Sequence, residues 1–309
     1  MILALDIGGT KIATGLVDGG RIVRRAQVAT PSGDAEAVWR AVVDAIDSLG
    51  VDVPLDAVGV ACAGPINRTT DLVGPLNIPG WCDGFPLQAR LAALVGATPV
   101  SIALDSACMA LGEQQHGAGV GSTAMLGIVV STGVGGGLVF DGRPWLGRTG
   151  NAGHVGHIVV EPDGPACGCG GRGCVEAVAR GPALAQWARE RGWRGDTAEQ
   201  LAADGRGGDP VAVAAFERGG RAVGLMIAGV AAVCDLDVVV VGGGVALAGE
   251  LLFTPIRRTL AEHAALGYLA ELDVRPAALG AGAALLGAAV LASSASATAS
   301  TPGASGGRP

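Results

Sequence analysis

The sequence predicts an α/β fold made of two similar lobes with a cleft between them. Three observations support this prediction. Short apolar segments typical of strands alternate with segments of helical spacing. A strand, a glycine-rich turn and a second strand occur near the start, at residues 2–17, and again at residues 124–140. The chain of 309 residues is also long enough for about two domains.

The first half is expected to contain five strands and three helices. Apolar runs bounded by turn residues predict strands at Ile2–Ile7, Ile12–Val17, Arg21–Ala29, Ala57–Ala63 and Val100–Leu104. Apolar residues three or four positions apart predict a helix at Asp34–Leu49, and we expect two more at Pro86–Leu94 and Ser106–Gln115.

The second half is expected to repeat this order. Strands are predicted at Ala124–Ser131, Leu138–Phe140, Leu236–Val241 and Asp273–Arg275, with a glycine turn at Gly133–Gly137. Helices are predicted at about 181–193 and 209–234, after the strand that ends near residue 241, and at 282–292. Residues 293–309 are rich in Ser, Ala and Gly and are expected to be a disordered tail.

Composition excludes several classes of function. The formal net charge is -7 and aromatic residues make up 3%, which argues against a nucleic-acid partner, because such proteins present basic surfaces and aromatic platforms. Neither a signal peptide nor a membrane span is recognisable. The seven cysteines are an odd number in a chain with no export signal, so we expect a cytoplasmic protein with reduced thiols.

The first motif with chemical content is the segment that follows the first strand. Glycines leave backbone N–H groups open to an anion such as a phosphate. Asp6, just before the turn, is placed to hold the water shell of Mg²⁺, and Lys11 is the only lysine in the chain. A plain hairpin turn is the alternative. The predicted nucleotide-binding residues here are Asp6, Gly8, Gly9, Thr10 and Lys11.

The second motif, STGVGGG at 131–137, repeats this pattern in the second half. Two anion-binding turns at the starts of two lobes are more specific than one, and together they would hold a triphosphate from both sides. Two glycine-rich hairpins made only for packing are the alternative.

Asp105 stands at the end of a predicted strand and at the start of a helix. A carboxylate at the carboxyl end of a strand lies where α/β proteins bind ligands, and there it can accept a proton from a substrate hydroxyl. A simple helix N-cap is an equally good explanation of an aspartate at this position.

Three cysteines and one histidine lie within residues 157–174. Three thiolates and one imidazole match a closed, four-ligand structural zinc site. A redox pair or unrelated thiols are the alternatives. The predicted ligands are His157, Cys167, Cys169 and Cys174. Nearby polar residues that could fix sugar hydroxyls are Asn77, His154 and Glu176.

Taken together, these motifs resemble those of ROK-family sugar kinases, which have the actin/hexokinase-like (ribonuclease H-like) ATPase fold. The resemblance covers nearly all of residues 1–292, and the zinc motif with its flanking Gly-His is its most specific part. It rests on DIGGTK at 6–11, AGPI at 63–66, LNIPGW at 76–81, Asp105 with GE at 112–113, STGVGGG at 131–137, AGHVGH at 152–157, CGCGGRGC at 167–174 with the Val-Glu after it, and VVGGGV at 240–245.

The resemblance implies ATP- and Mg²⁺-dependent transfer of the γ-phosphoryl group to the 6-hydroxyl of a hexose, with Asp105 as general base. It places the triphosphate between the two turns, with Thr132, Gly133 and Gly135 in the second and Gly243 nearby. It implies that Asn77, Asp105, His157 and Glu176 contact the sugar, so His157 would serve both sugar and zinc. It implies lobes of 1–117 plus a helix at about 280–292, and of 118–279 with the zinc loop at 157–174. The homodimer common in the family is also expected.

The sequence departs from the family pattern at the sugar. His154 stands where the family usually has Glu, Leu104 where it has Asn before the catalytic Asp, and Ala107 where it has a second Asn. An unpaired buried hydroxyl costs about 1–3 kcal/mol, enough to change the preferred substrate. We therefore expect the substrate to be glucose or a glucose-like hexose or amino-hexose, and kanosamine or N-acetylmannosamine is the alternative substrate.

Two other classes of function remain. A sugar-responsive repressor, a class that the family includes, needs a DNA-binding module before the first lobe. The expected ATPase turn already begins at residue 6, so we do not expect such a module. A sugar and nucleotide sensor without turnover remains open because of His154 and Leu104. An assay of ATP consumption over a panel of sugars separates a sensor from an enzyme.

Overall fold

The computed structural model describes residues 1–299, with side chains to residue 295. This chain divides into two compact units. Unit 1 comprises Met1–Gly112, Leu146–Asn151 and the described residues from Gly282 onward, and unit 2 comprises Glu113–Trp145 and Ala152–Ala281. The segment Leu146–Asn151, which the sequence analysis placed in the second lobe, is fastened to unit 1 because the Asn151 amide exchanges two hydrogen bonds with the backbone of Ile66, of 2.9 and 2.6 Å.

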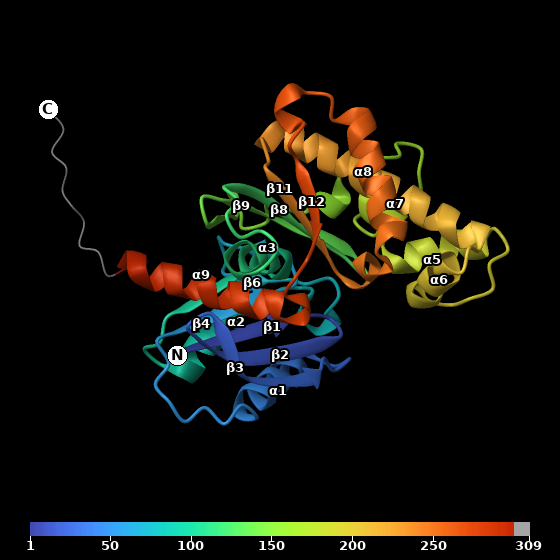
Figure 1. Ribbon diagram of the computed structural model, residues 1–309. Helices are drawn as coiled ribbons and strands as arrows, with labels where there is room; N and C mark the ends of the chain where they lie inside the picture. The colour runs from blue at the N-terminus through green and yellow to red at the C-terminus, as the bar shows by residue number, and fades with distance from the viewer. Residues whose placement is uncertain (300–309) are drawn as a thin grey trace, which may run out of the picture. The chain divides into compact units, whose positions relative to one another are not determined.

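Each unit is built on a five-stranded mixed sheet. The sheet of unit 1 has the order β3-β2-β1-β4-β7, with β1 (Ile2–Ile7), β2 (Lys11–Asp18), β3 (Arg21–Ala29), β4 (Ala57–Cys62) and β7 (Val100–Leu104). The sheet of unit 2 has the order β10-β9-β8-β11-β12, with β8 (Ala124–Val130), β9 (Val134–Phe140), β10 (Arg143–Trp145), β11 (Val238–Gly242) and β12 (Asp273–Pro276). Both sheets are seen in Figure 1.

The two sheets have the same topology. In each, the first strand pairs antiparallel with the second and parallel with the fourth, which pairs parallel with the fifth. The strands with a parallel neighbour on each side, β4 and β11, are buried along their whole length, as expected when helices cover both faces of a sheet. The predicted α/β fold with two similar lobes is confirmed at the level of each unit.

Unit 1 carries four helices and a small hairpin around its sheet. The Asp34 side chain accepts a 2.7 Å hydrogen bond from the N–H of Ala37 and thereby caps the first helix. Trp81 is fully buried and stacks on Phe85, with ring centroids 4.3 Å apart. The elements are α1 (Ala35–Asp47), β5 (Ile66–Asn67), β6 (Leu72–Val73), η1 (Pro79–Trp81), α2 (Leu87–Val95), α3 (Asp105–His116) and α9 (Ala283–Ala299).

Helix α9 packs closely against α3 and β4 because glycines remove side chains from the contact (Figure 1). A Cβ added at Gly287 would overlap the carbonyl oxygen of Cys108 on α3. One added at Gly59 of β4 would overlap the carbonyl oxygen of Ala288. Backbone meets backbone here, so these contacts have no flexible side chain that could move aside.

We therefore expect Gly287→Ala to destabilise the protein by about 1–3 kcal/mol through overpacking, although Ala is the better helix former. Gly229→Ala is the matched control, because Gly229 also lies within a helix but has open space around its Cβ position. That variant should gain up to about 1 kcal/mol. Urea denaturation measures both, and a Gly287→Ala variant as stable as the control would contradict the close packing.

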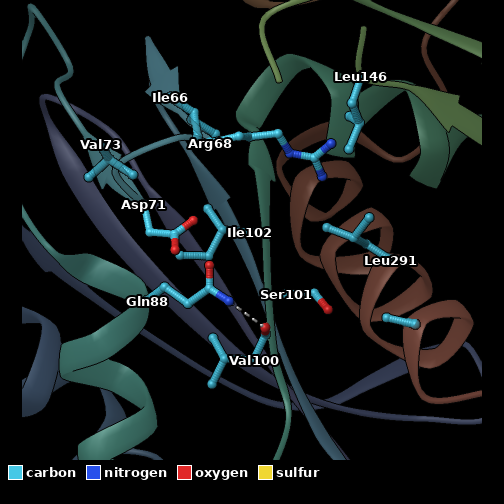
Figure 2. Close-up of a pocket in the computed structure, with 11 residues that line it drawn as sticks. Ile66, Arg68, Asp71, Val73, Gln88, Val100, Ser101, Ile102, Leu146 and Leu291 are labelled. Carbon is cyan, nitrogen blue, oxygen red and sulfur yellow. Dashed lines mark hydrogen bonds between the residues drawn. The ribbon is translucent and has the colours of Figure 1, made fainter. Parts of the chain in front are cut away.

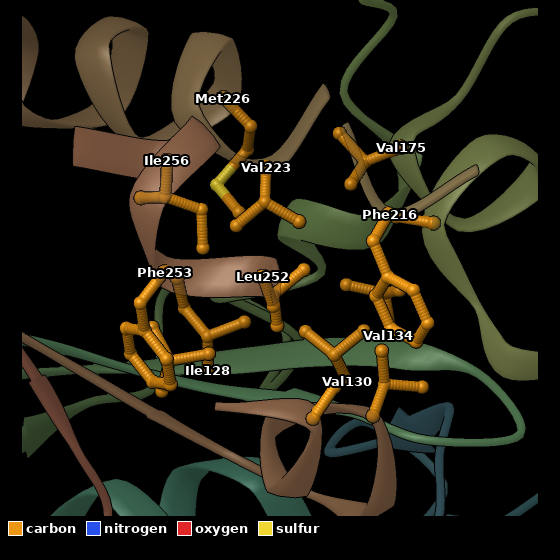
Figure 3. Packing of buried hydrophobic residues seen from close by; sticks show 14 of the residues in the cluster. Ile128, Val130, Val134, Val175, Phe216, Val223, Met226, Leu252, Phe253 and Ile256 are labelled. Carbon is orange, nitrogen blue, oxygen red and sulfur yellow. The ribbon is translucent and has the colours of Figure 1, made fainter. Parts of the chain in front are cut away.

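Unit 2 has a core between its sheet and two long helices. Figure 3 shows Val223 and Met226 of one helix, Leu252 and Ile256 of the other and the strand residue Ile128 in one cluster, and all five are fully buried. The helices of this unit are η2 (Val155–His157), α4 (Val175–Ala179), α5 (Gly181–Arg189), α6 (Ala198–Arg206), α7 (Pro210–Cys234), η3 (Gly244–Ala248), α8 (Glu250–His263), η4 (Gly267–Leu269) and η5 (Gly280–Gly282).

Two expectations about local structure were wrong. The glycines at 135–137 belong to β9, which begins at Val134, so the turn is limited to Ser131-Thr132-Gly133. Glycine is needed in the strand because a Cβ at Gly136 would press on Val155 at 2.8 Å. Helix α9 continues to Ala299, so residues 293–299 are helical. Alanine favours helix, and the Ser293 and Ser294 hydroxyls donate to carbonyls one turn earlier.

The rest of the predicted tail, residues 300–309, lies outside the described residues. Within residues 1–299, no helix combines the length and the hydropathy that a membrane span requires.

Candidate functional site

Two carboxylates lie at the carboxyl-terminal edge of the sheet of unit 1. Asp6 is the penultimate residue of β1, and Asp105 follows β7 as the first residue of α3. The pKa of Asp6 is raised to about 6, mainly because burial disfavours its charge and secondly because the Asp105 carboxylate is near. Lys11 and Arg25 oppose the rise. Two acids that share one site are a common arrangement for binding a divalent cation and for proton transfer.

The raised pKa of Asp6 predicts a dependence of stability on pH. Because the folded pKa lies above the unfolded value of 3.8, ionised Asp6 reduces stability at neutral pH, and this penalty fades as the pH falls through 6 towards 4. Asp6→Asn, which imitates the neutral acid, should therefore stabilise the protein at pH 7.5 by about 2–3 kcal/mol. The gain should be roughly half as large at pH 5.

Thermal unfolding at the two pH values measures this effect. Asp18→Asn, at the opposite end of β2 from Lys11, is the control. Equal stability of Asp6→Asn and the parent at pH 7.5 would show that burial does not raise the pKa of Asp6.

The first glycine turn lies beside these acids. The Gly8 N–H donates to the Lys11 carbonyl at 3.0 Å, and the Thr30 hydroxyl donates to the Gly8 carbonyl at 2.6 Å. Asn77 packs on Gly9, where an added Cβ would overlap the Asn77 backbone oxygen and press on its side chain. The structure therefore brings the turn and the predicted sugar contact Asn77 together, while Thr10 stays exposed.

The second glycine turn lies in unit 2. The Ser131 N–H donates to the Gly133 carbonyl at 2.8 Å, and the Gly181 N–H donates to the Ser131 carbonyl at 2.8 Å. Gly243 has a φ of 93° and lies against the backbone of Val130, where a Cβ would overlap the carbonyl oxygen. Thr132, Gly133 and Gly243 are thus gathered at one end of this sheet, whereas Gly135 belongs to β9 and pairs with Val129.

The four predicted zinc ligands converge in unit 2. The candidate ligand atoms of His157, Cys167, Cys169 and Cys174 all lie within 4.8 Å of one another. The Sγ atoms of Cys169 and Cys174 are 3.8 Å apart, and Cys167 Sγ is 3.7 Å from His157 Nδ1. Two sulfurs on a tetrahedral zinc lie about 3.8 Å apart, and a sulfur and a nitrogen about 3.5 Å apart, given bonds of about 2.3 and 2.0 Å. The donor set and its spacing fit zinc.

The remaining predicted sugar residues stand next to this cluster. His157 turns Nδ1 toward the cysteine sulfur, which leaves Nε2 at the other side of the ring. The His154 ring stacks at a centroid distance of 6.0 Å from the His157 ring. Glu176 is in the first turn of α4, directly after Cys174 and Val175, and its carboxylate accepts a 2.9 Å hydrogen bond from the Val134 N–H.

The structure brings the predicted residues together in two groups, one in each unit. The group in unit 1 holds a carboxylate pair, a glycine turn and an amide. The group in unit 2 holds a glycine turn, the Cys/His cluster and two further polar side chains. Each group combines a glycine turn with fixed polar side chains, an arrangement that suits an anionic or a polyhydroxylated ligand.

A cavity of about 370 Å³ in unit 1 is distinct from these residues. Figure 2 shows that it lies between the β5–β6 hairpin, β7 and α9, with the Gln88 amide bonded to the Val100 carbonyl. None of the predicted site residues lines it.

Sequence reasoning missed the role of Glu113. Its fully buried carboxylate accepts hydrogen bonds from the N–H groups of Ala118, Ala278 and Leu279, at 2.9, 3.1 and 2.8 Å. The Glu113 carboxylate thus joins the first residues of unit 2, near Ala118, to its last residues, at Ala278 and Leu279. The available signal was a glutamate four residues after the apolar Met109 on a helical face.

Comparisons with known proteins match nearly the whole chain to one family. The family model described as "ROK family" matches residues 2–295. A glucokinase of Streptomyces coelicolor is 35% identical over 94% of this chain and 97% of its own length. An N-acetylmannosamine kinase of Citrobacter koseri is 38% identical over 94% and 98%. The crystal structure of a ROK family glucokinase from Streptomyces griseus, in complex with glucose and AMPPNP, matches with a TM-score of 0.82 and 36% identity over 95% of this chain and 99% of that one.

Proposed function

Because this chain belongs to the ROK family, we propose that it is an ATP-dependent hexose kinase, which transfers the γ-phosphoryl group to the 6-hydroxyl of glucose or a glucose-like sugar. The observation that carries this proposal is the pair Asp6 and Asp105 beside the first glycine turn. Hexokinase-type transfer needs a base for the hydroxyl and N–H groups for the phosphates, and these residues supply both.

Asp105 is the proposed general base. It lies at the start of a helix on a rigid sheet edge, and one of its oxygens, Oδ1, accepts a 2.6 Å hydrogen bond from the Ser106 N–H. The other oxygen would take the hydroxyl proton as the bond from the sugar oxygen to phosphorus forms. Asn77, held against Gly9, would fix another sugar hydroxyl.

The phosphates are assigned to the two turns. Gly8, Gly9, Thr10 and Lys11 would bind them in unit 1, and Thr132 and Gly133 in unit 2, with Gly243 close to the nucleotide. Asp6 would hold Mg²⁺ through its water shell, and the ion would supply neutralisation of phosphate charge. Gly135, the remaining predicted contact of this unit, lies within β9 two residues after the turn and pairs with Val129, so it would contact the phosphates from the strand rather than from the turn.

The Cys/His cluster is the proposed zinc site. All four positions are filled by protein ligands, so its role is structural. It would hold His157, whose Nε2 would contact the sugar, and the neighbouring His154 and Glu176.

The identity of the sugar is the open part of this function. Both glucokinases and N-acetylmannosamine kinases are similar to this chain. His154, where the family usually has Glu, stands next to His157, and Leu104 is buried beside Asp105 and offers no hydrogen bond. These changes favour a second candidate, an amino-hexose such as kanosamine, because they remove an acidic group and an amide from the sugar pocket.

A coupled assay of ADP release tests the proposal with glucose, mannose, N-acetylmannosamine, glucosamine and kanosamine, and mass spectrometry identifies the product. We expect turnover with at least one hexose and a ratio of kcat/KM values that names the substrate. Binding of sugar and nucleotide with no ADP release would instead identify a sensor. Light scattering on the same sample tests the expected homodimer.

A further inference from the structure

Glu176 contacts the second glycine turn as well as lying among the proposed sugar contacts. Its Oε2 accepts the Val134 N–H at 2.9 Å, and Val134 directly follows the turn Ser131-Thr132-Gly133. A Cβ added at Gly133 would lie 2.8 Å from the same oxygen. The carboxylate thus packs against the end of the turn and bonds the first strand residue behind it.

Both partners of this hydrogen bond, Val134 and Glu176, are held in place by buried groups. Val134 itself and Val175, which precedes Glu176 in α4, are buried, and Figure 3 shows their side chains within the hydrophobic core of unit 2. The Val175 N–H donates to the Ile158 carbonyl at 3.0 Å, next to the zinc ligand His157. The zinc ligand Cys174 immediately precedes α4. Glu176 is therefore positioned by the zinc loop.

The other side of the turn is held by backbone hydrogen bonds. The Gly181 N–H bonds the Ser131 carbonyl, and the Ser131 N–H bonds the Gly133 carbonyl. Glu176, by contrast, ties the Gly133 end of the turn to α4 through a side chain. Loss of this side chain would leave the buried Val134 N–H without its acceptor, which is costly.

We propose that Glu176 is a positioning residue for the nucleotide, in that it holds the Ser131–Gly133 turn in the shape that receives the phosphates. This inference rests on the proposed function, since it assigns the turn to ATP. A negative charge near phosphates is unfavourable in itself, so the hydrogen bond and the charge have opposite effects on nucleotide affinity.

The test separates the two effects by measuring the Kd of AMPPNP with Mg²⁺ by calorimetry, in the absence of any sugar. Glu176→Ala loses the acceptor, and we expect an affinity about tenfold weaker. Glu176→Gln keeps an acceptor oxygen and loses the charge, so it should bind at least as well as the parent. Glu199→Ala removes an exposed glutamate from the first turn of α6 and is the matched control, with no change expected. Zinc content should remain that of the parent in all three.

Parent-like nucleotide affinity in Glu176→Ala, with a raised KM for sugar, would overturn the inference and leave Glu176 as a sugar contact. Tighter nucleotide binding by that variant would also overturn it, because charge would then dominate. If Glu176→Ala does not fold, Glu176→Asp decides, since its carboxylate is one methylene shorter, loses the hydrogen bond from the Val134 N–H and should weaken nucleotide binding, and parent-like binding by that variant would overturn the inference. A parent protein that binds no AMPPNP would instead remove the proposed function itself.

Discussion

Replacing Asp105 by asparagine should lower kcat at least about a hundredfold while leaving the fold intact. Asparagine has nearly the same shape, and its side-chain oxygen can still accept the hydrogen bond from the Ser106 N–H. It cannot accept the proton of the sugar hydroxyl. Since proton removal is the only step assigned to this side chain besides sugar contact, the effect should fall on kcat far more than on the KM for ATP.

The ADP-release assay measures the change, and Asp18→Asn serves as the matched control. Asp18 is an exposed aspartate at the far end of β2 and should leave kcat unchanged. Circular dichroism and thermal unfolding establish that Asp105→Asn is folded. Turnover near that of the parent would remove Asp105 from the mechanism and with it the chemical part of the proposed function.

Cys169→Ser should abolish stoichiometric zinc binding and lower the melting temperature by about 5–10 °C. Cys169 is exposed, so the change from sulfur to oxygen removes almost no buried surface. Any large loss of stability must therefore come from the metal. Backbone hydrogen bonds such as that from the Cys167 N–H to the Gly171 carbonyl shape this loop, but no disulfide links Cys169 and Cys174, whose Sγ atoms lie 3.8 Å apart.

Elemental analysis gives the zinc content and calorimetry the melting temperature. Cys82→Ser is the control, because Cys82 is an exposed thiol outside the cluster. It should keep both its zinc and its melting temperature. A Cys169→Ser protein that lacks zinc yet melts with the parent would show that the metal does not stabilise the fold.

The strands were the most predictable part of the fold. β1, β3 and β7 begin and end at the predicted residues, and the apolar runs of β1 and β7 stop at Gly8 and at Asp105. Helices α4 and α6 were not predicted. The five residues of α4 are too few to show periodicity, and α6 has Leu201 as its one large apolar residue. The glycines of β9 were misassigned for another reason. Nothing in the local sequence distinguishes a glycine in a turn from one that makes room for a neighbouring element, as Gly136 does for η2.

The chemistry of the site could be predicted where spacing along the chain is sufficient. The Cys/His motif is local, so its four ligands were predicted together and do converge. Asp6 and Asp105 are almost a hundred residues apart, and their proximity follows only because parallel strands end at one sheet edge. The hydrogen bonds of Glu113 and of Glu176 were not predictable, since a carboxylate that binds a backbone N–H leaves no pattern in the sequence.

The sequence alone was enough for the residue types, for most strands and the longer helices, and for short-range motifs such as the Cys/His cluster, because these depend on neighbours within a few positions. The folded structure was needed to show which glycines are required by a close approach, which carboxylates accept backbone N–H groups, and that the pKa of Asp6 is raised. The physical reason is that burial and contact between distant segments arise from packing, and the free energy of a charged or polar group depends on what surrounds it after the chain has folded.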